Sequence, residues 1–218
     1  MTYERIRQDH AVQVYISRAD AALEVLGYTE HSFAHVTKVA EEAGRILETM
    51  GYPERTVELA RIAGYLHDIG NVVNRADHSQ SGAVMAFRIL DRMDFPPEEI
   101  AVIISAIGNH DEGTGIPVDP VAAALIIADK SDVRRSRVRN PEDVHADVHD
   151  RVNYSATRAQ ADVDPDSREL VLSICVDISV SSPMEYLEIF MKRMQMCSKA
   201  AKHLGLAFHL DINGQRLV

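Results

Sequence analysis

Cysteine, long apolar runs and surplus positive charge are all scarce in this sequence. Its two cysteines, Cys175 and Cys197, have neither the number nor the spacing of a disulfide scaffold or a cysteine zinc cluster. Both lie in apolar patterns, so we expect both thiols to be buried in the core. This sparing use of cysteine indicates a reducing compartment.

The apolar segments are short. The first ten residues, MTYERIRQDH, contain no apolar signal core. Stretches such as 121–128 fall far short of the roughly 20 residues that a membrane span requires. We therefore expect a cytoplasmic protein that does not enter a membrane.

The charge balance is acidic, with 23 Lys and Arg against 33 Asp and Glu and a formal net charge of −10. Binding of a nucleic acid polymer requires clustered Lys and Arg, so such a partner is not expected. A small phosphorylated substrate is compatible with an acidic chain, because bound metal ions supply positive charge locally.

Apolar residues recur at helical spacing through residues 1 to about 139. Five segments show this pattern: Val36, Val39, Ala43 and Ile46; Leu59, Ala63 and Leu66; Ala83, Ala86 and Leu90; Ile100, Ile103 and Ile107; Val121, Leu125 and Ala128. Predicted helix ends are marked by Pro53, Pro97 and Pro120 in first turns, Asp119 as an N-cap, and Gly51 and Gly70 as stops. The sequence therefore predicts a helical domain over residues 1–140.

The pattern changes after the basic stretch 134–141. Segment 152–163 alternates partly with a period of two, and segment 169–180 alternates cleanly, with one face formed by Leu170, Leu172, Ile174, Val176, Ile178 and Val180. The turn residues 164–167 lie between them, so the two segments are predicted to form a hairpin.

A helix is then predicted from Ser182-Pro183 to His203, ended by Gly205, and a last strand over Leu206 to Leu210. Residues 150–218 thus form a small α+β module of β-β-α-β order. The clean alternation requires one sheet face to be buried, either on the helical domain or on a second subunit. A homodimer is one expected way to cover it.

Histidine and aspartate occupy core-facing positions of several predicted helices. His35, His67 and His110 continue apolar stripes, Asp68 and Asp129 lie at helix ends, and His78 precedes the next helix. A single histidine on an apolar stripe is usually a satisfied core residue. A set on neighbouring helices would cost several kcal/mol per group unless the side chains pair or bind a metal. The sequence therefore predicts a metal site of imidazoles and carboxylates inside the bundle.

These residues also carry a family resemblance. The order His35, His67-Asp68, Asp129 resembles the His…His-Asp…Asp signature of the HD superfamily, as do the segments HVTKVAEEA (35–43), LHDIGN (66–71) and IIADKSD (126–132). The resemblance covers about residues 30–139. It implies an HD-type helical bundle, mostly α with the small C-terminal extension, and a metal-dependent phosphohydrolase.

Two further segments resemble the binuclear HD-GYP branch of that superfamily. His78 lies in HSQSGAVMA, and NHDEGTGIP (109–117) resembles a shortened HD-GYP motif with Asn109, Asp111 and Ile116 as departures. The departures argue against hydrolysis of cyclic dinucleotides. Asp68 would bridge two divalent ions, one held by His35, His67 and Asp129 and the other by His78 and His110. The sequence does not distinguish among Fe, Mn, Zn, Ni and Mg as the bound metal.

The expected reaction is hydrolysis of a phosphomonoester or phosphoanhydride, most simply of a nucleotide, by a metal-bound hydroxide. Asp68 and Lys130 are the expected catalytic residues, and Lys130, Arg134, Arg135 and His31 are the expected substrate-binding residues. The basic residues equally suit a solvated helix end, and His31 an exposed position. A non-catalytic module that binds metal and nucleotide is the alternative function.

Two further pairs of residues have alternative interpretations. His145 and His149 have the i, i+4 spacing of a metal pair, but their polar segment favours an exposed face. Asp77 and Asp132 could orient metal ligands as hydrogen-bond acceptors, or could serve as caps or solvent-exposed groups.

Overall fold

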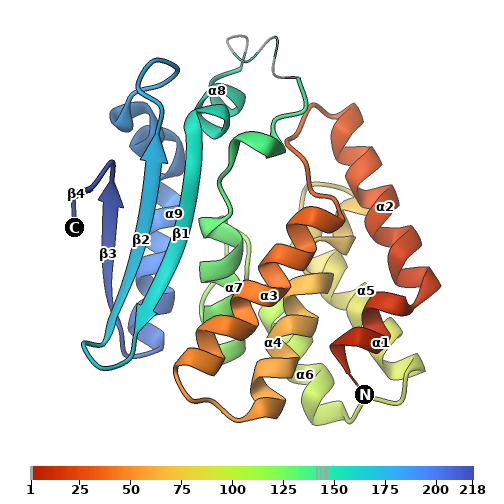
Figure 1. Cartoon of the computed structure of the whole chain (residues 1–218). Helices are drawn as coiled ribbons and strands as arrows, with labels where there is room; N and C mark the ends of the chain where they lie inside the picture. Colours follow the sequence, from red (N-terminus) through yellow and green to blue (C-terminus); the bar gives the residue numbers. More distant parts are fainter. Residues whose placement is uncertain (1, 141, 143, 145–146) are drawn as a thin grey trace.

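The computed structural model describes residues 2–140, 142, 144 and 147–218. A bundle of helices is followed by a small sheet with one long helix behind it (Figure 1). The first part consists of α1 (Tyr3–Gln8), α2 (His10–Val25), α3 (Phe33–Thr49), α4 (Glu54–Leu66), the 3-10 turn η1 (Ile69–Val72), α5 (His78–Arg92), α6 (Pro97–Gly108), α7 (Pro120–Ser131) and η2 (Arg135–Arg137). The second part consists of α8 (Val148–Ser155), β1 (Ala156–Asp164), β2 (Glu169–Val176), α9 (Pro183–His203), β3 (Ala207–Ile212) and β4 (Gln215–Arg216). The expected fold class, mostly α with a small α+β extension, is confirmed.

The helix ends follow the residues that were expected to set them. Pro97 and Pro120 are the first residues of α6 and α7, and Asp119 accepts a hydrogen bond from the Ala122 amide at 2.8 Å. Gly51 follows α3 with a φ of 75°, the left-handed conformation that glycine tolerates best. Pro53 is the exception, since it lies one residue before α4 begins.

Gly70 was expected to stop a helix, but its place in the fold has another cause. It lies within η1, where α5 packs directly against the turn. A Cβ atom on Gly70 would overlap the carbonyl oxygen of His78 and the amide nitrogen of Gly82. The missing side chain therefore lets α5, and with it His78, approach the turn that follows Asp68.

The sheet has the order β1-β2-β3-β4. β1 and β2 form the expected antiparallel hairpin, whereas β3 returns parallel to β2 after α9. The even-numbered residues of β2 from Leu170 to Val176 are buried, as the alternation predicted.

Several expectations for this part were wrong in detail. Residues 152–155 complete α8 instead of starting a strand, because Asp147 caps that helix by accepting the His149 and Asp150 amides. Ile178 lies beyond the end of β2 and is 75% exposed. Cys175 is exposed because it alternates with the buried residues of β2, whereas Cys197 is buried as expected. The last strand runs over Ala207–Ile212 instead of Leu206 to Leu210, and β4 was not foreseen.

One apolar core extends through both parts of the chain. Phe190 of α9, Leu172 of β2 and Leu125 of α7 belong to the same buried cluster, and α9 packs against α7. The apolar face of the sheet is therefore covered within the chain. Among the described residues, no helix has the length and apolar character to cross a bilayer.

Gly70→Ala should lower the free energy of unfolding by at least about 2 kcal/mol, because the added methyl group meets backbone atoms that have no room to move. Gly108→Ala is the matched control, since its Cβ would meet its nearest neighbours at an ordinary 3.8 Å. The control should leave stability unchanged or raise it by up to about 1 kcal/mol. Urea unfolding of the two variants makes the comparison, and equal stabilities would contradict the close approach at Gly70.

Candidate metal centre

The six expected ligands come from five helices or their ends and meet at one place. α3 contributes His35, the end of α4 contributes His67 and Asp68, and α7 contributes Asp129; His78 begins α5, and His110 follows α6. The four histidines and Asp68 are buried, and the Asp129 side chain is 12% exposed. Helices that are distant in sequence thus direct polar groups into the same interior point.

One group of donor atoms surrounds a point between α3, α4 and α7. The Nε2 atom of His35 lies 3.3 Å from Nε2 of His67, 3.4 Å from Oδ1 of Asp129 and 3.6 Å from Oδ2 of Asp68. Nε2 of His67 lies 3.3 Å from that same Asp68 oxygen. Ligand atoms bound at 2.0–2.2 Å around one tetrahedral ion stand about 3.4 Å apart, so this spacing suits a metal.

A second group uses the other oxygen of Asp68. Nε2 of His78 lies 3.2 Å from Nε2 of His110 and 3.5 Å from Oδ1 of Asp68, and Asp111 Oδ1 approaches His78 to 4.0 Å. Donor atoms of His67, Asp68 and His110 also fall within 4.8 Å of one another, so His67 borders both groups. The two carboxylate oxygens of Asp68 therefore face different sets of imidazoles.

The other ring nitrogens explain why every Nε2 atom points inward. Nδ1 of His67, His78 and His110 donates to the carbonyl oxygens of Gly64, Arg75 and Ile107 at 2.7, 3.1 and 2.6 Å. Nδ1 of His35 donates to Oδ2 of Asp132 at 2.8 Å. Carbonyls and carboxylates accept but do not donate, so Nδ1 carries the proton and Nε2 keeps a bare lone pair. Two pairs of facing lone pairs require a cation between them, and the donor set therefore fits divalent metal ions.

The pKa values describe the same side chains without a bound metal, where a proton on Nε2 of His67 takes the place of the cation. Burial and the charges of His67 and Lys130 lower the pKa of His110 to about 3, which keeps its lone pair available. Burial alone would lower the pKa of His67, but Asp68 and Asp129 outweigh it and raise that pKa to about 10. Although burial opposes their ionisation, His67 and other neighbouring cations hold the pKa values of Asp68 and Asp129 well below their usual range. The site thus attracts positive charge even without a metal.

Asp132 and Asn71 hold the ligands in place. Asp132 is fully buried and, besides His35, accepts from Lys38 at 2.7 Å and Arg134 at 3.0 Å. Of the alternatives for Asp132, orientation of a ligand is the one that the structure supports. Asn71 donates to Oδ1 of Asp68 at 2.9 Å, a role that no sequence pattern indicated. Asp77 is exposed at the start of α5 and caps no amide with its side chain.

The expected substrate-binding residues have different surroundings. Lys130 is buried with Nζ 2.8 Å from Oδ2 of Asp129, and His31 packs against the His35 ring. Arg134 is engaged by Asp132 and Glu30. Arg135 turns away to the carbonyl of Tyr154 and to Asp177, so it does not face the metal ligands. His149 lines an outer pocket, and His145 lies outside the described residues.

Two neighbouring cavities adjoin the candidate ligands. A small cavity of about 20 Å³ is lined by Asp68, His78, His110, Asp129 and Lys130, and an outer pocket of about 510 Å³ lies above it. Both are lined by His31, Arg75, Glu112 and Arg193. Of these four, only His31 was expected at the site, because Arg75, Glu112 and Arg193 lie in polar contexts that no sequence pattern separates from ordinary surface residues.

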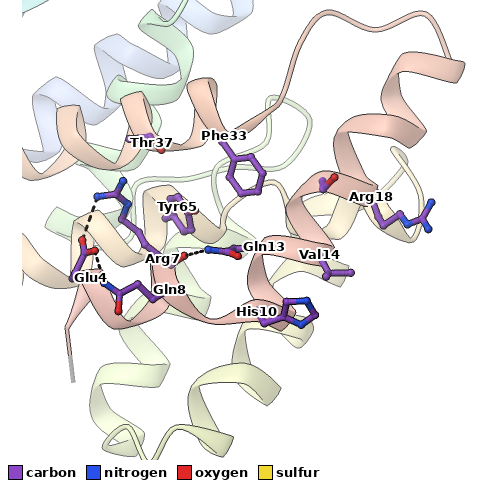
Figure 2. Close-up of a pocket in the computed structure, with 11 residues that line it drawn as sticks. Glu4, Arg7, Gln8, His10, Gln13, Val14, Arg18, Phe33, Thr37 and Tyr65 are labelled. Atoms are coloured by element: carbon purple, nitrogen blue, oxygen red, sulfur yellow. Dashed lines mark hydrogen bonds and ion pairs between the residues drawn. The ribbon is translucent and has the colours of Figure 1, made fainter.

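A separate hollow of about 790 Å³ lies on the outer face of α1, α2 and α3 (Figure 2). Its wall includes Phe33 and Thr37 of α3. Each is two positions from His35, a spacing that places side chains on different faces of a helix. The Arg7 side chain in this hollow is paired with Glu4 at 3.2 Å. No expected metal ligand lines this hollow, so it is separate from the candidate centre.

Asp132→Ala should weaken divalent metal binding about 10- to 100-fold, because His35 loses the acceptor that fixes its ring and proton. Asp132→Asn keeps an acceptor oxygen, so its metal affinity should lie between those of wild type and Asp132→Ala. Asp177→Ala is the control, since it removes an Arg135 partner at 3.0 Å away from the proposed ligands. Competition with a chelating dye measures the three affinities. Wild-type affinity in Asp132→Ala would exclude the orienting role.

Two known proteins are similar to part of this chain. An uncharacterized protein of Methanocaldococcus jannaschii is 27% identical over 164 residues, which are 65% of this chain and 62% of that protein. The chain therefore spans less than two thirds of its relative's length. A solved structure of a predicted HD superfamily hydrolase from an uncultured Thermotogales bacterium is 24% identical and covers 57% of this chain and 67% of its own, with a TM-score of 0.46.

The HD domain family matches residues 32–152, more than half of the chain. That range begins just before α3 and ends in α8, so it includes all six proposed ligands. The chain belongs to the HD domain family.

Proposed function

We propose that this protein is a metal-dependent phosphohydrolase that cleaves a phosphomonoester or phosphoanhydride, with a nucleotide as substrate. Proteins of the HD domain family are generally metal-dependent hydrolases. The observation that carries the proposal is the convergence of four Nε2 lone pairs and two carboxylates beneath a pocket that basic side chains line. A purely structural metal site would be closed by protein ligands, whereas this one adjoins a cavity.

Two ions are proposed, with Asp68 shared between them. Divalent ions bound here supply Lewis-acid polarisation of a phosphoryl oxygen and activate water. His35, His67 and Asp129 would hold one ion, and His78 and His110 the other. Their donor types suit Fe, Mn, Zn, Ni or Mg.

Lys130 is proposed to act directly on the substrate. Its Nζ atom lines the inner cavity 2.8 Å from Asp129 and 3.8 Å from Glu112. A buried ammonium in this position stabilises the negative charge that develops on phosphoryl oxygens. The side chain is fixed by two carboxylates, so it would not need to reorganise during the reaction.

The outer pocket supports a nucleotide substrate. Tyr28 lines it and is 43% exposed. The Arg75 guanidinium lies 5.5 Å from the centre of the Tyr28 ring, over one face, so the opposite face is the proposed stacking surface for a base. His31 donates from Nδ1 to the Thr29 carbonyl at 2.6 Å, so its Nε2 is an acceptor that suits a substrate hydroxyl better than a phosphate. In the loop that resembles HD-GYP proteins, Gly115 donates to the Asp111 carbonyl at 2.8 Å, which holds Asp111 beside His78.

The alternative remains a module that binds metal and nucleotide without turnover. Asn109 favours it, since its side chain donates to the Ser105 carbonyl at 2.9 Å and is not among the residues that line the inner cavity. Release of phosphate from nucleotide substrates, sensitive to a chelator, separates an enzyme from such a module.

Asp68→Ala should abolish phosphohydrolase activity and nearly all metal binding, because it removes an oxygen from each group of donors. Asp91→Ala, which removes an exposed partner of Arg88 at 3.8 Å, should keep both. Phosphate release and elemental analysis are measured on the same preparations. Full activity in folded Asp68→Ala protein would refute the site.

His110→Ala should lower the metal content from about two ions per chain towards one, because His110 faces only the second group closely. His35→Ala should have the corresponding effect on the first ion and lower activity at least as much. Elemental analysis after exhaustive dialysis gives the stoichiometry. A wild-type content of one ion, unchanged in His110→Ala, would show that the centre is mononuclear.

A further inference from the structure

A guanidinium from outside the HD domain lies at the mouth of the metal cavity. Arg193 belongs to α9, well beyond residue 152, where the family match ends. It lines both the inner cavity and the outer pocket, together with His31, Arg75 and Glu112. Because these four residues line both cavities, a substrate that extends from the outer pocket towards the candidate metal ligands would contact them, and we call them the collar.

The Arg193 side chain is held on one edge and one face. Its Nε donates to Oε1 of Glu112 at 2.7 Å, and its guanidinium carbon lies 4.4 Å from the centre of the Phe190 ring. Neither terminal nitrogen has a hydrogen-bond partner among the described residues. The edge with two parallel N–H groups, which binds phosphate in a bidentate manner, is therefore left available in a fixed orientation.

Glu112 connects this arginine to the metal ligands. The same Oε1 atom lies 3.8 Å from Nζ of Lys130, whose Nζ lies 2.8 Å from Oδ2 of Asp129. Carboxylates Asp111, Asp147 and Asp150 line the outer pocket. Those charges repel a phosphate from the outer wall, so the collar cations are the place where it would bind.

The sizes of the two cavities place a phosphoryl group at the collar. The inner cavity of about 20 Å³ has room for little more than one water-sized probe, whereas the outer pocket of about 510 Å³ suits an organic group. A phosphoryl group with oxygens directed at the metal ligands must then lie level with Arg75 and Arg193.

We propose that Arg193 binds the phosphoryl group of the substrate, so that the C-terminal module completes the substrate site of the HD domain. This inference rests on the proposed function, because it takes a phosphate ester as the substrate. Arg193 adds a residue that the expected set of Lys130, Arg134, Arg135 and His31 did not contain. Removing the Arg193 guanidinium group should weaken the binding of phosphate without lowering the metal content.

The test is the binding of inorganic phosphate to the metal-loaded, full-length protein, measured by calorimetry. Arg193→Gln should raise the dissociation constant about tenfold or more, the loss typical of a charge-assisted, bidentate contact. Arg193→Lys keeps the charge but not the two parallel N–H groups, so its dissociation constant for phosphate should lie between those of wild type and Arg193→Gln.

Arg151→Gln is the matched control. Arg151 also belongs to the C-terminal part, is paired with Glu185 at 2.6 Å and is 25% exposed, as is Arg193, but it lines neither cavity. Its phosphate affinity should equal that of wild type. Melting temperature and metal content should be the same in Arg193→Gln and Arg151→Gln.

Unchanged phosphate affinity in Arg193→Gln, no phosphate binding by wild type, or loss of metal from Arg193→Gln would each overturn the proposal. Turnover of p-nitrophenyl phosphate is measured in parallel, and KM should rise in Arg193→Gln more than kcat falls. A wild-type protein that binds phosphate through Arg193 but hydrolyses no phosphate ester would refute the hydrolase and leave the phosphate site intact.

Discussion

The hydrogen bonds of four histidine Nδ1 atoms determine the chemistry of this molecule. Three donate to backbone carbonyls near a helix end and one donates to Asp132, so all four Nε2 lone pairs are directed inward. Lone pairs that face each other at 3.2–3.3 Å are stable only with positive charge between them. Hydrogen bonds at the helix ends thus produce a site with affinity for cations inside an otherwise apolar bundle. The carboxylates of Asp68 and Asp129 increase that affinity.

Packing between the helices positions these histidine and aspartate side chains. η1 packs closely on α5 through Gly70, which brings His78 to Asp68, and α7 carries both Asp129 and Lys130 with its apolar face buried. The same helix packs against α9, so the C-terminal part lies against the helix that carries Asp129 and Lys130. The C-terminal part is therefore placed to contribute Arg193 to the mouth of the cavity. The candidate metal ligands and Arg193 thus come from different segments of the chain, which share one continuous core.

Buried charge is balanced locally at the centre. Asp132 sits among His35, Lys38, Arg134 and Arg137, and although burial opposes its ionisation, those neighbours hold its pKa below the usual range. Glu112 lies between Lys130 and Arg193 in the same way. Each carboxylate thereby fixes the direction of a cation or an imidazole, and breaking such a set leaves a buried charge without a partner. This explains why so many ionic side chains can be accommodated beside the metal ligands.

The sequence by itself determined helices α3 to α7 and the six candidate metal ligands. Helical periodicity, proline and aspartate at helix starts, and histidines on apolar stripes are local patterns, so these helices and candidate residues could be predicted without coordinates. Alternation likewise predicted the inner face of β2, but partial alternation over 152–155 misplaced the start of β1 because the Asp147 cap dominates there. Tertiary structure alone decided that Asp132 orients His35 across 97 residues, and that Arg135 turns away while Arg193 reaches the cavity. Those outcomes depend on which helix faces pack together, and contacts between residues distant in sequence leave no periodic pattern to detect.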